Sequence, residues 1–138
     1  MKLGMIQGRL LRPEDGGIQE FPSCWKEEFD RAKSLGLNHI EWIVTTRSFS
    51  YNAIFSKDCS EFPISSLCAD NLVDDRFTQS DFLRDNLDPI CKAAIDNSVM
   101  WVTVPLLEKS AIHDAQKRQA FKQEILKYAE RYPRLNFS

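Results

Sequence analysis

Five polar residues follow or interrupt short apolar stretches of this chain, and their side chains are suited to binding a hydroxylated molecule. They are Gln7, Arg9, Glu41, Asp70 and Glu108. Gln7 offers a neutral amide, and Arg9 offers a guanidinium that can clamp a phosphate or a carboxylate. Glu41 lies inside the apolar stretch HIEWIV, where a carboxylate is costly to bury unless it is paired. We therefore expect Glu41 to be the catalytic residue of the set and the other four to bind substrate.

Each of these residues also has a structural interpretation. Gln7 and Arg9 can tether the loop that follows them, and Asp70 can form an Asx turn or lead a helix. Glu108 can be solvated beside Lys109. The sequence alone leaves these alternatives open.

Other catalytic chemistry finds little support in the sequence. There is no P-loop, no G-x-G-x-x-G and no G-x-S-x-G motif. His39 and His113 have no second histidine or carboxylate at ligand spacing, so no metal site and no cofactor are expected within this chain. The cysteines are expected to be free thiols, because the chain has no C-x-x-C pair and no secretory signal; they are Cys24, Cys59, Cys68 and Cys91.

The elements that must position these residues alternate between strands and helices. Short apolar stretches predict strands at 2–7, 39–44, 64–69, 100–106 and 134–137. Helical spacing follows three candidate N-caps, which are Ser23, Ser80 and Asp114. This succession is typical of βαβ crossovers and therefore of a parallel sheet. Ligands of such sheets bind at the carboxyl ends of the strands, where the five polar residues are expected to meet.

Two segments depart from a regular strand–helix repeat. Residues 45–63 are rich in Ser, Thr, Asn and aromatic residues without helical period, so the second helix is predicted to be missing or reduced to a turn. Pro89 interrupts the helix after the third strand, which predicts a kink or two short helices. Gly36 stands where a helix commonly ends in the left-handed conformation.

Length and charge limit the classes of protein that this chain can represent. Its 138 residues carry a net charge of −2, which disfavours a phosphate-driven nucleic-acid contact. We find no signal peptide and no apolar run long enough for a membrane span, so a cytoplasmic location is expected. A closed (β/α)8 barrel needs about 250 residues. We therefore predict one domain, residues 1–138, with the α/β fold of a (βα)4 half of a TIM-type barrel and a fifth strand begun at residue 134.

Four segments resemble one family of barrel enzymes along the whole chain and in order. MIQGRL, LGLNHIEWI, ISSLCADNLVD and VTVPLLE are similar to the sugar phosphate isomerase/epimerase family of the xylose isomerase-like TIM barrels. The resemblance implies a sugar or sugar phosphate as substrate. It also implies a divalent metal, Mn, Mg or Zn, that polarises substrate oxygens while paired carboxylates move a proton beside a carbonyl.

The part of that family's site that this chain matches is the first half. The resemblance carries over to Gln7, Arg9, Glu41, Asp70 and Glu108, whereas the family's metal ligands come from the fifth and later strands. The chain is therefore expected to be inactive as an isomerase on its own, and whether it is an enzyme stays open. A half-barrel leaves edges and an apolar face uncovered, so a homodimer or a complementary half-barrel is the expected partner.

Two other functions are compatible with these residues. The first is a non-catalytic, self-associating module that binds a small hydroxylated ligand. The second is a relative of the DNA-repair nucleases, which the acidic balance of the chain disfavours.

Overall fold

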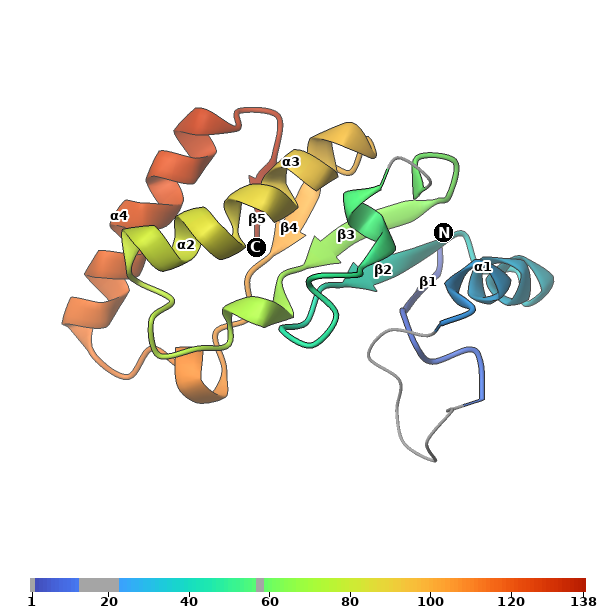
Figure 1. The fold of residues 1–138 in the computed structure, drawn as a ribbon, viewed down its shortest axis with the longest axis horizontal. Coiled ribbons are helices and arrows are strands. Elements are labelled where there is room, and N and C mark those ends of the chain that lie inside the picture. Colours follow the sequence, from blue (N-terminus) through green and yellow to red (C-terminus); the bar gives the residue numbers. More distant parts are fainter. Residues whose placement is uncertain (1, 13–22, 57–58) are drawn as a thin grey trace.

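The computed structural model describes residues 2–12, 23–56 and 59–138. These residues form one five-stranded sheet in the order β1-β2-β3-β4-β5, with every neighbouring pair parallel (Figure 1). The strands are β1 (Gly4–Ile6), β2 (His39–Ile43), β3 (Ile64–Cys68), β4 (Trp101–Thr103) and β5 (Asn136–Phe137). The helices are α1 (Trp25–Ser34), α2 (Ser80–Asn86), α3 (Asp88–Asp96) and α4 (Ala115–Arg131). The prediction of an α/β fold with a parallel sheet is confirmed.

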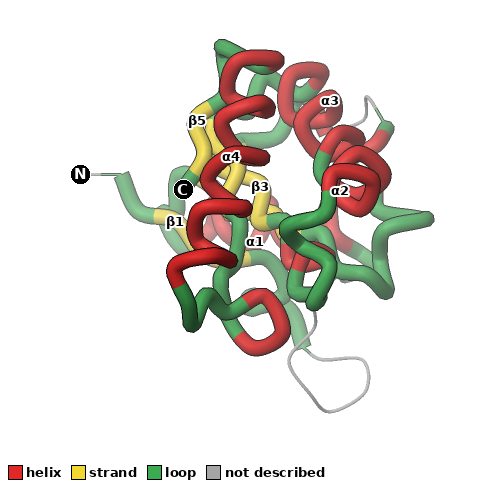
Figure 2. Tube along the Cα trace, turned by 90° about the vertical axis from the view of Figure 1, so that its left-hand side faces the viewer, coloured by secondary structure: helices red, strands yellow, loops and turns green. Residues whose placement is uncertain are grey.

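One face of the sheet is covered by helices and holds the core. Side chains on a strand alternate between faces, and Ile40, Trp42 and Leu67 are all buried on the helical side. The ring of Trp42 lies 5.2 Å from that of Trp25 and 6.1 Å from that of Phe29. Helix α1 therefore packs on β2 through three aromatic rings, and α2, α3 and α4 gather over the other half of the sheet (Figure 2).

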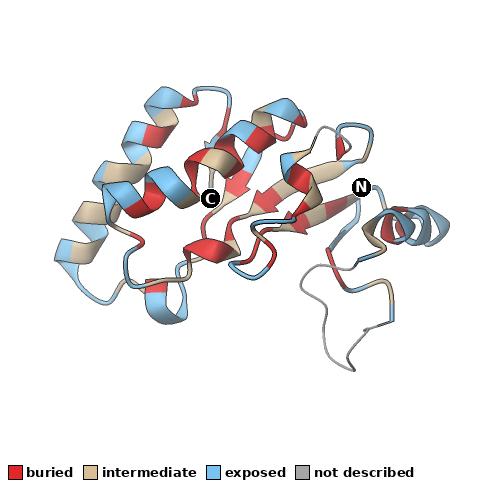
Figure 3. Ribbon diagram, viewed as in Figure 1, coloured by how far each residue is buried: buried red, intermediate tan, exposed pale blue. Residues whose placement is uncertain are grey.

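The opposite face, here called the open face, is defined by the alternate strand residues. Cross-strand register pairs Ile6 with Glu41, Cys68 with Thr103, and Trp101 with Asn136. None of its side chains falls in the buried class, in contrast to the neighbouring strand positions (Figure 3). The open face consists of Ile6, Glu41, Ile43, Ser66, Cys68, Trp101, Thr103 and Asn136.

The described residues between β2 and β3 contain the 3-10 turn η1 (Ala53–Phe55) and no α-helix, which confirms the prediction of a reduced second helix. The Asn52 side chain holds this turn against β2 through hydrogen bonds. Its Oδ1 accepts hydrogen bonds from Trp42 Nε1 (2.8 Å) and Ile54 N (3.1 Å). Its Nδ2 donates to the Ile43 carbonyl oxygen at 3.0 Å. One buried amide thus ties the end of β2 to the turn that replaces the helix.

The helix ends agree with the sequence in part. Asp114 caps α4 by accepting a hydrogen bond from Lys117 N at 2.7 Å, and Pro89 stands in the first turn of α3, just after α2 ends. Gly36 has φ +74°, as expected for a residue that follows a helix. The other two caps were predicted one residue away from their positions, because Cys24 precedes α1 and Gln79 precedes α2.

Strands β1 and β2 approach closely at their amino ends. A Cβ added to Gly4 would lie 2.1 Å from ring atoms of His39, so only glycine fits opposite this imidazole. His39 is the first residue of β2, as predicted, and lies at the end of the sheet opposite the carboxyl ends of the strands. In the part of the chain that is described, no helix has the length and apolarity to cross a membrane.

Candidate carboxylate site at the open face

Glu41 and Asp70 lie within electrostatic range of Cys68. Glu41 points to the open face of β2, Cys68 ends β3 on the same face, and Asp70 begins the 3-10 turn η3 (Asp70–Leu72) directly after β3. Both carboxylates act electrostatically on the Cys68 thiol. We call Glu41, Cys68 and Asp70 the carboxylate site. It joins two of the five residues that the sequence singled out.

The Cys68 thiol is held in its neutral form. Burial, and then the negative charges of Glu41 and Asp70, raise its pKa to about 12. Thiolate is the nucleophilic form of cysteine, so this residue is a poor nucleophile at neutral pH.

Gln7 and Arg9 lie in the loop that leaves β1. The Gln7 side chain is buried, and its Oε1 accepts a hydrogen bond from Ile43 N at 3.1 Å. The backbone N–H of Gln7 donates to the Glu41 carbonyl oxygen at 2.9 Å, so Gln7 extends the β1–β2 ladder by two bonds. Arg9 is exposed, and its Nη1 donates to the Gln7 carbonyl oxygen at 3.4 Å. Both residues thus make the tethering contacts that were left open as an alternative, and their part in ligand binding stays a prediction.

A buried carboxylate that sequence reasoning missed anchors this loop. Glu28 of α1 is 1% exposed, and its Oε1 accepts hydrogen bonds from the backbone N–H groups of Arg9 (2.9 Å) and Leu10 (3.1 Å). Its Oε2 is buried without a hydrogen-bond partner among the described residues. The only sequence signal was an acidic residue in the first helical turn, which is ordinarily read as a dipole effect.

Glu108 lies apart from the carboxylate site in the described contacts. It begins the 3-10 turn η4 (Glu108–Ser110) after β4, and its side chain is exposed. Its φ of 50° lies in the left-handed region, which a non-glycine residue adopts at some cost. Ser110 stabilises the turn, because its Oγ donates to the Pro105 carbonyl oxygen at 2.8 Å. No described hydrogen bond or ion pair brings Glu108 to Glu41 or Asp70.

The donor set of the described residues does not fit the divalent metal that the resemblance implies. No group of three or more His, Cys, Asp or Glu side chains within 2–12, 23–56 and 59–138 is placed to hold an ion. Two carboxylates beside a neutral thiol can accept hydrogen bonds from hydroxyl groups, and one of them can accept a proton.

No protein-family model matches this chain, and no curated protein matches it.

Proposed function

We propose that this chain forms the first four βα units of a sugar or sugar-phosphate isomerase/epimerase-like TIM barrel and holds a hydroxylated ligand at the carboxylate site. The observation that supports the proposal is that Glu41, in the middle of β2, and Asp70, directly after β3, both act electrostatically on Cys68 at the carboxyl end of β3. Ligands of parallel α/β sheets bind at that edge. The resemblance of the four segments named above supplies the sugar as the ligand class, and a cytoplasmic location belongs to the same proposal.

The chemistry proposed for the site is hydrogen bonding and proton movement by carboxylates. Glu41 is partly buried on the open face, and a bound hydroxyl group can donate to its carboxylate. For a sugar with a carbonyl group, the same oxygen can accept a proton from the adjacent carbon. Asp70 is placed to hold a second hydroxyl of the same ligand.

A second function, ligand binding without turnover, is favoured by the donor set. No group of three or more His, Cys, Asp or Glu side chains in the described residues is placed to hold an ion, and family enzymes are expected to need a metal. In this alternative the same residues bind a hydroxylated molecule, and no bond is made or broken.

One set of variants separates the two functions. Purified protein is assayed for isomerisation of xylose, fructose and fructose 6-phosphate, with and without Mn²⁺, and the same sugars are titrated by calorimetry. Glu41→Gln is compared with Glu61→Gln, an exposed carboxylate outside the carboxylate site. Turnover lost only in Glu41→Gln supports the enzyme. Binding without turnover, weakened roughly five-fold or more by Glu41→Gln alone, supports the binder. If the wild type shows no turnover and no binding, the proposal is contradicted.

We further propose a second copy of the chain as the partner, so that two half-barrels close into one barrel. The observation that favours this partner is apolar exposure on the open face and its edge strand, where Ile6 is 43% exposed and Trp101 is 48% exposed. A single sheet also leaves β1 and β5 as free parallel edges. Placing β5 of each copy beside β1 of the other continues the parallel order and removes both edges. Its test is given in the Discussion.

A further inference from the structure

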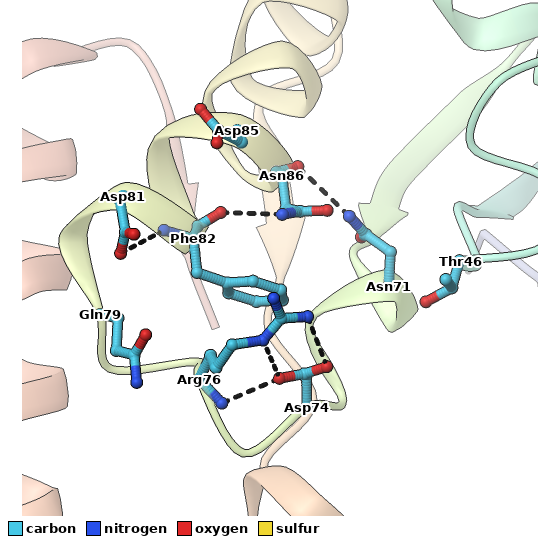
Figure 4. Close-up of a pocket in the computed structure, with 9 residues that line it drawn as sticks. All are labelled: Thr46, Asn71, Asp74, Arg76, Gln79, Asp81, Phe82, Asp85 and Asn86. Atoms are coloured by element: carbon cyan, nitrogen blue, oxygen red, sulfur yellow. Dashed lines mark hydrogen bonds and ion pairs between the residues drawn. The ribbon is translucent and has the colours of Figure 1, made fainter.

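A polar cavity lies at the carboxyl end of the sheet, between the loop after β2 and helix α2 (Figure 4). Its volume is about 190 Å³. None of the five residues singled out by the sequence lines it, and neither do Cys68 and Glu28. Drug-sized pockets measure about 300–1,000 Å³, so this cavity has room for a small molecule only.

One wall of the cavity is an ion pair whose charges are already matched. Arg76 donates from Nε to Asp74 Oδ1 (2.9 Å) and from Nη2 to Asp74 Oδ2 (3.0 Å). These bonds lower the pKa of Asp74 to about 2, so the carboxylate stays ionised. The guanidinium also lies 4.7 Å from the centre of the Phe82 ring. This wall therefore has little remaining attraction for a phosphate group.

The other walls carry neutral groups with hydrogen-bonding capacity to spare. The Asn86 amide donates to the Phe82 carbonyl oxygen at 2.9 Å and keeps its Oδ1 for another donor. Asn71 is 3% exposed and donates to the Asn86 carbonyl oxygen over a long 3.3 Å, while its Oδ1 has no partner among the described residues. The side chains of Thr46 and Gln79 make no described hydrogen bond and border the same space. A buried amide oxygen without a donor is uncommon in folded proteins.

The charge of the lining selects against anions. Asp74, Asp81 and Asp85 stand against one arginine, Arg76, which gives a formal charge of −2 from three acids and one base. Asp85 is also paired with Arg84 at 2.9 Å. Phosphorylated or carboxylated molecules are repelled by such a lining. Hydroxyl groups, which both donate and accept, match the amide and hydroxyl groups of Thr46, Asn71, Gln79 and Asn86.

We propose that this cavity is a binding site for a small, neutral polyol or a single unphosphorylated sugar ring. Its hydroxyl groups bond to the side chains of Thr46, Gln79 and Asn86, and a small rotation of the Asn71 amide exchanges the long bond to Asn86 for one to the ligand. The site is separate from the carboxylate site and goes beyond the proposed function, because it needs neither Glu41 nor a barrel partner.

Nuclear magnetic resonance titration of the full chain tests the site. Xylitol, xylose and glycerol are the neutral probes, and inorganic phosphate is the charged one. We expect the neutral probes to shift the side-chain amide signals of Asn71, Gln79 and Asn86 at millimolar concentration, with no shift from phosphate. Gln79→Ala and Thr46→Ala, two exposed residues, should each weaken xylitol binding roughly five-fold or more. Circular dichroism confirms that these variants fold.

Glu41→Gln is the control that keeps this inference apart from the proposed function. If xylitol binding survives Glu41→Gln and is lost in Gln79→Ala, the cavity is the binding site, whatever the isomerase assay shows. If binding is lost in Glu41→Gln and kept in Gln79→Ala, the proposal for the cavity is wrong and the carboxylate site binds xylitol. The proposal for the cavity is also wrong if no neutral probe shifts the side-chain amide signals of Asn71, Gln79 and Asn86, or if phosphate shifts them more strongly than xylitol does.

Discussion

At the scale of single residues, Glu28 shows how a buried carboxylate can serve the site without touching it. It accepts hydrogen bonds from two successive backbone N–H groups in the loop after β1. That loop also holds Gln7, whose side chain bonds to β2 only two residues beyond Glu41. Glu28 therefore helps to hold the loop whose Gln7 is bonded to β2 beside Glu41.

Glu28→Gln is predicted to lower the free energy of unfolding by about 1–3 kcal/mol. A glutamine keeps one acceptor oxygen but loses the charge that strengthens both bonds, and it buries an NH2 group beside two N–H donors. Urea denaturation followed by tryptophan fluorescence measures the change. Glu27→Gln, an exposed neighbour on the same helix, is the control. Equal effects of the two variants would rule out the anchoring role.

At the scale of elements, Asp88 joins α3 to the end of α4. It is 4% exposed, and its carboxylate accepts from Tyr132 Oη (2.5 Å), Arg131 Nη1 (2.7 Å) and Lys92 Nζ (2.7 Å). Burial by itself disfavours the charged form, but the bonds from Lys92 and Tyr132 and the charge of Arg131 lower the pKa of Asp88 below its ordinary value. Burial and the bond to Asp88 raise the pKa of Tyr132, so the phenol remains a donor.

Asp88→Asn is predicted to lower the free energy of unfolding at pH 7 by about 1–2 kcal/mol. Lys92 and Arg131 are more than half exposed, so most of the loss comes from the buried bond to Tyr132. Because the folded-state pKa of Asp88 is depressed, its stabilisation is present above the unfolded pKa of about 3.9 and is lost as pH falls below it. The variant should therefore lose less stability than the wild type on acidification.

Thermal unfolding between pH 7 and pH 3 measures both effects. Asp85→Asn, which removes an exposed ion pair with Arg84, should leave the midpoint and its pH dependence unchanged. A wild-type pH dependence that persists in Asp88→Asn would show that other carboxylates carry it.

At the scale of the whole molecule, the helices cover one face of the sheet only. Buried residues gather under the helices (Figure 3), whereas Ile6 and Trp101 on the open face are exposed. Large exposed apolar side chains gathered on one face mark an interaction surface. The second copy proposed above covers that face and both free edges.

The wild-type chain is predicted to be a dimer or larger at micromolar concentration, measured by gel filtration with light scattering. Trp101→Lys places a charge on the open face beside the edge strand β5 and should shift the protein to monomer. Leu126→Lys is the matched control, because Leu126 is 51% exposed in an apolar groove on the helical side. A stable wild-type monomer contradicts the partner proposal, and dissociation by Leu126→Lys alone would place the contact on α4 instead.

Much of the fold could be predicted because its signals are local. Strand and helix patterns gave the parallel sheet and the split at Pro89, and the lack of period between residues 45 and 63 indicated the reduced helix. Two N-caps were misplaced by one residue, since the end of a helix depends on packing as well as on the capping side chain. Of the candidate residues, Glu41 and Asp70 both act electrostatically on Cys68, and Gln7 bonds the loop after β1 to β2.

The sequence by itself determined the succession of elements, because hydrophobic period and turn residues act over a few positions of the chain. Only the tertiary structure decided which polar groups are partners. Glu28 reaches Arg9 across 19 positions, and Asp88 reaches Tyr132 across 44. Such bonds form between groups that are distant in the sequence and become buried together on folding. Neither residue type nor spacing therefore predicts which groups become partners.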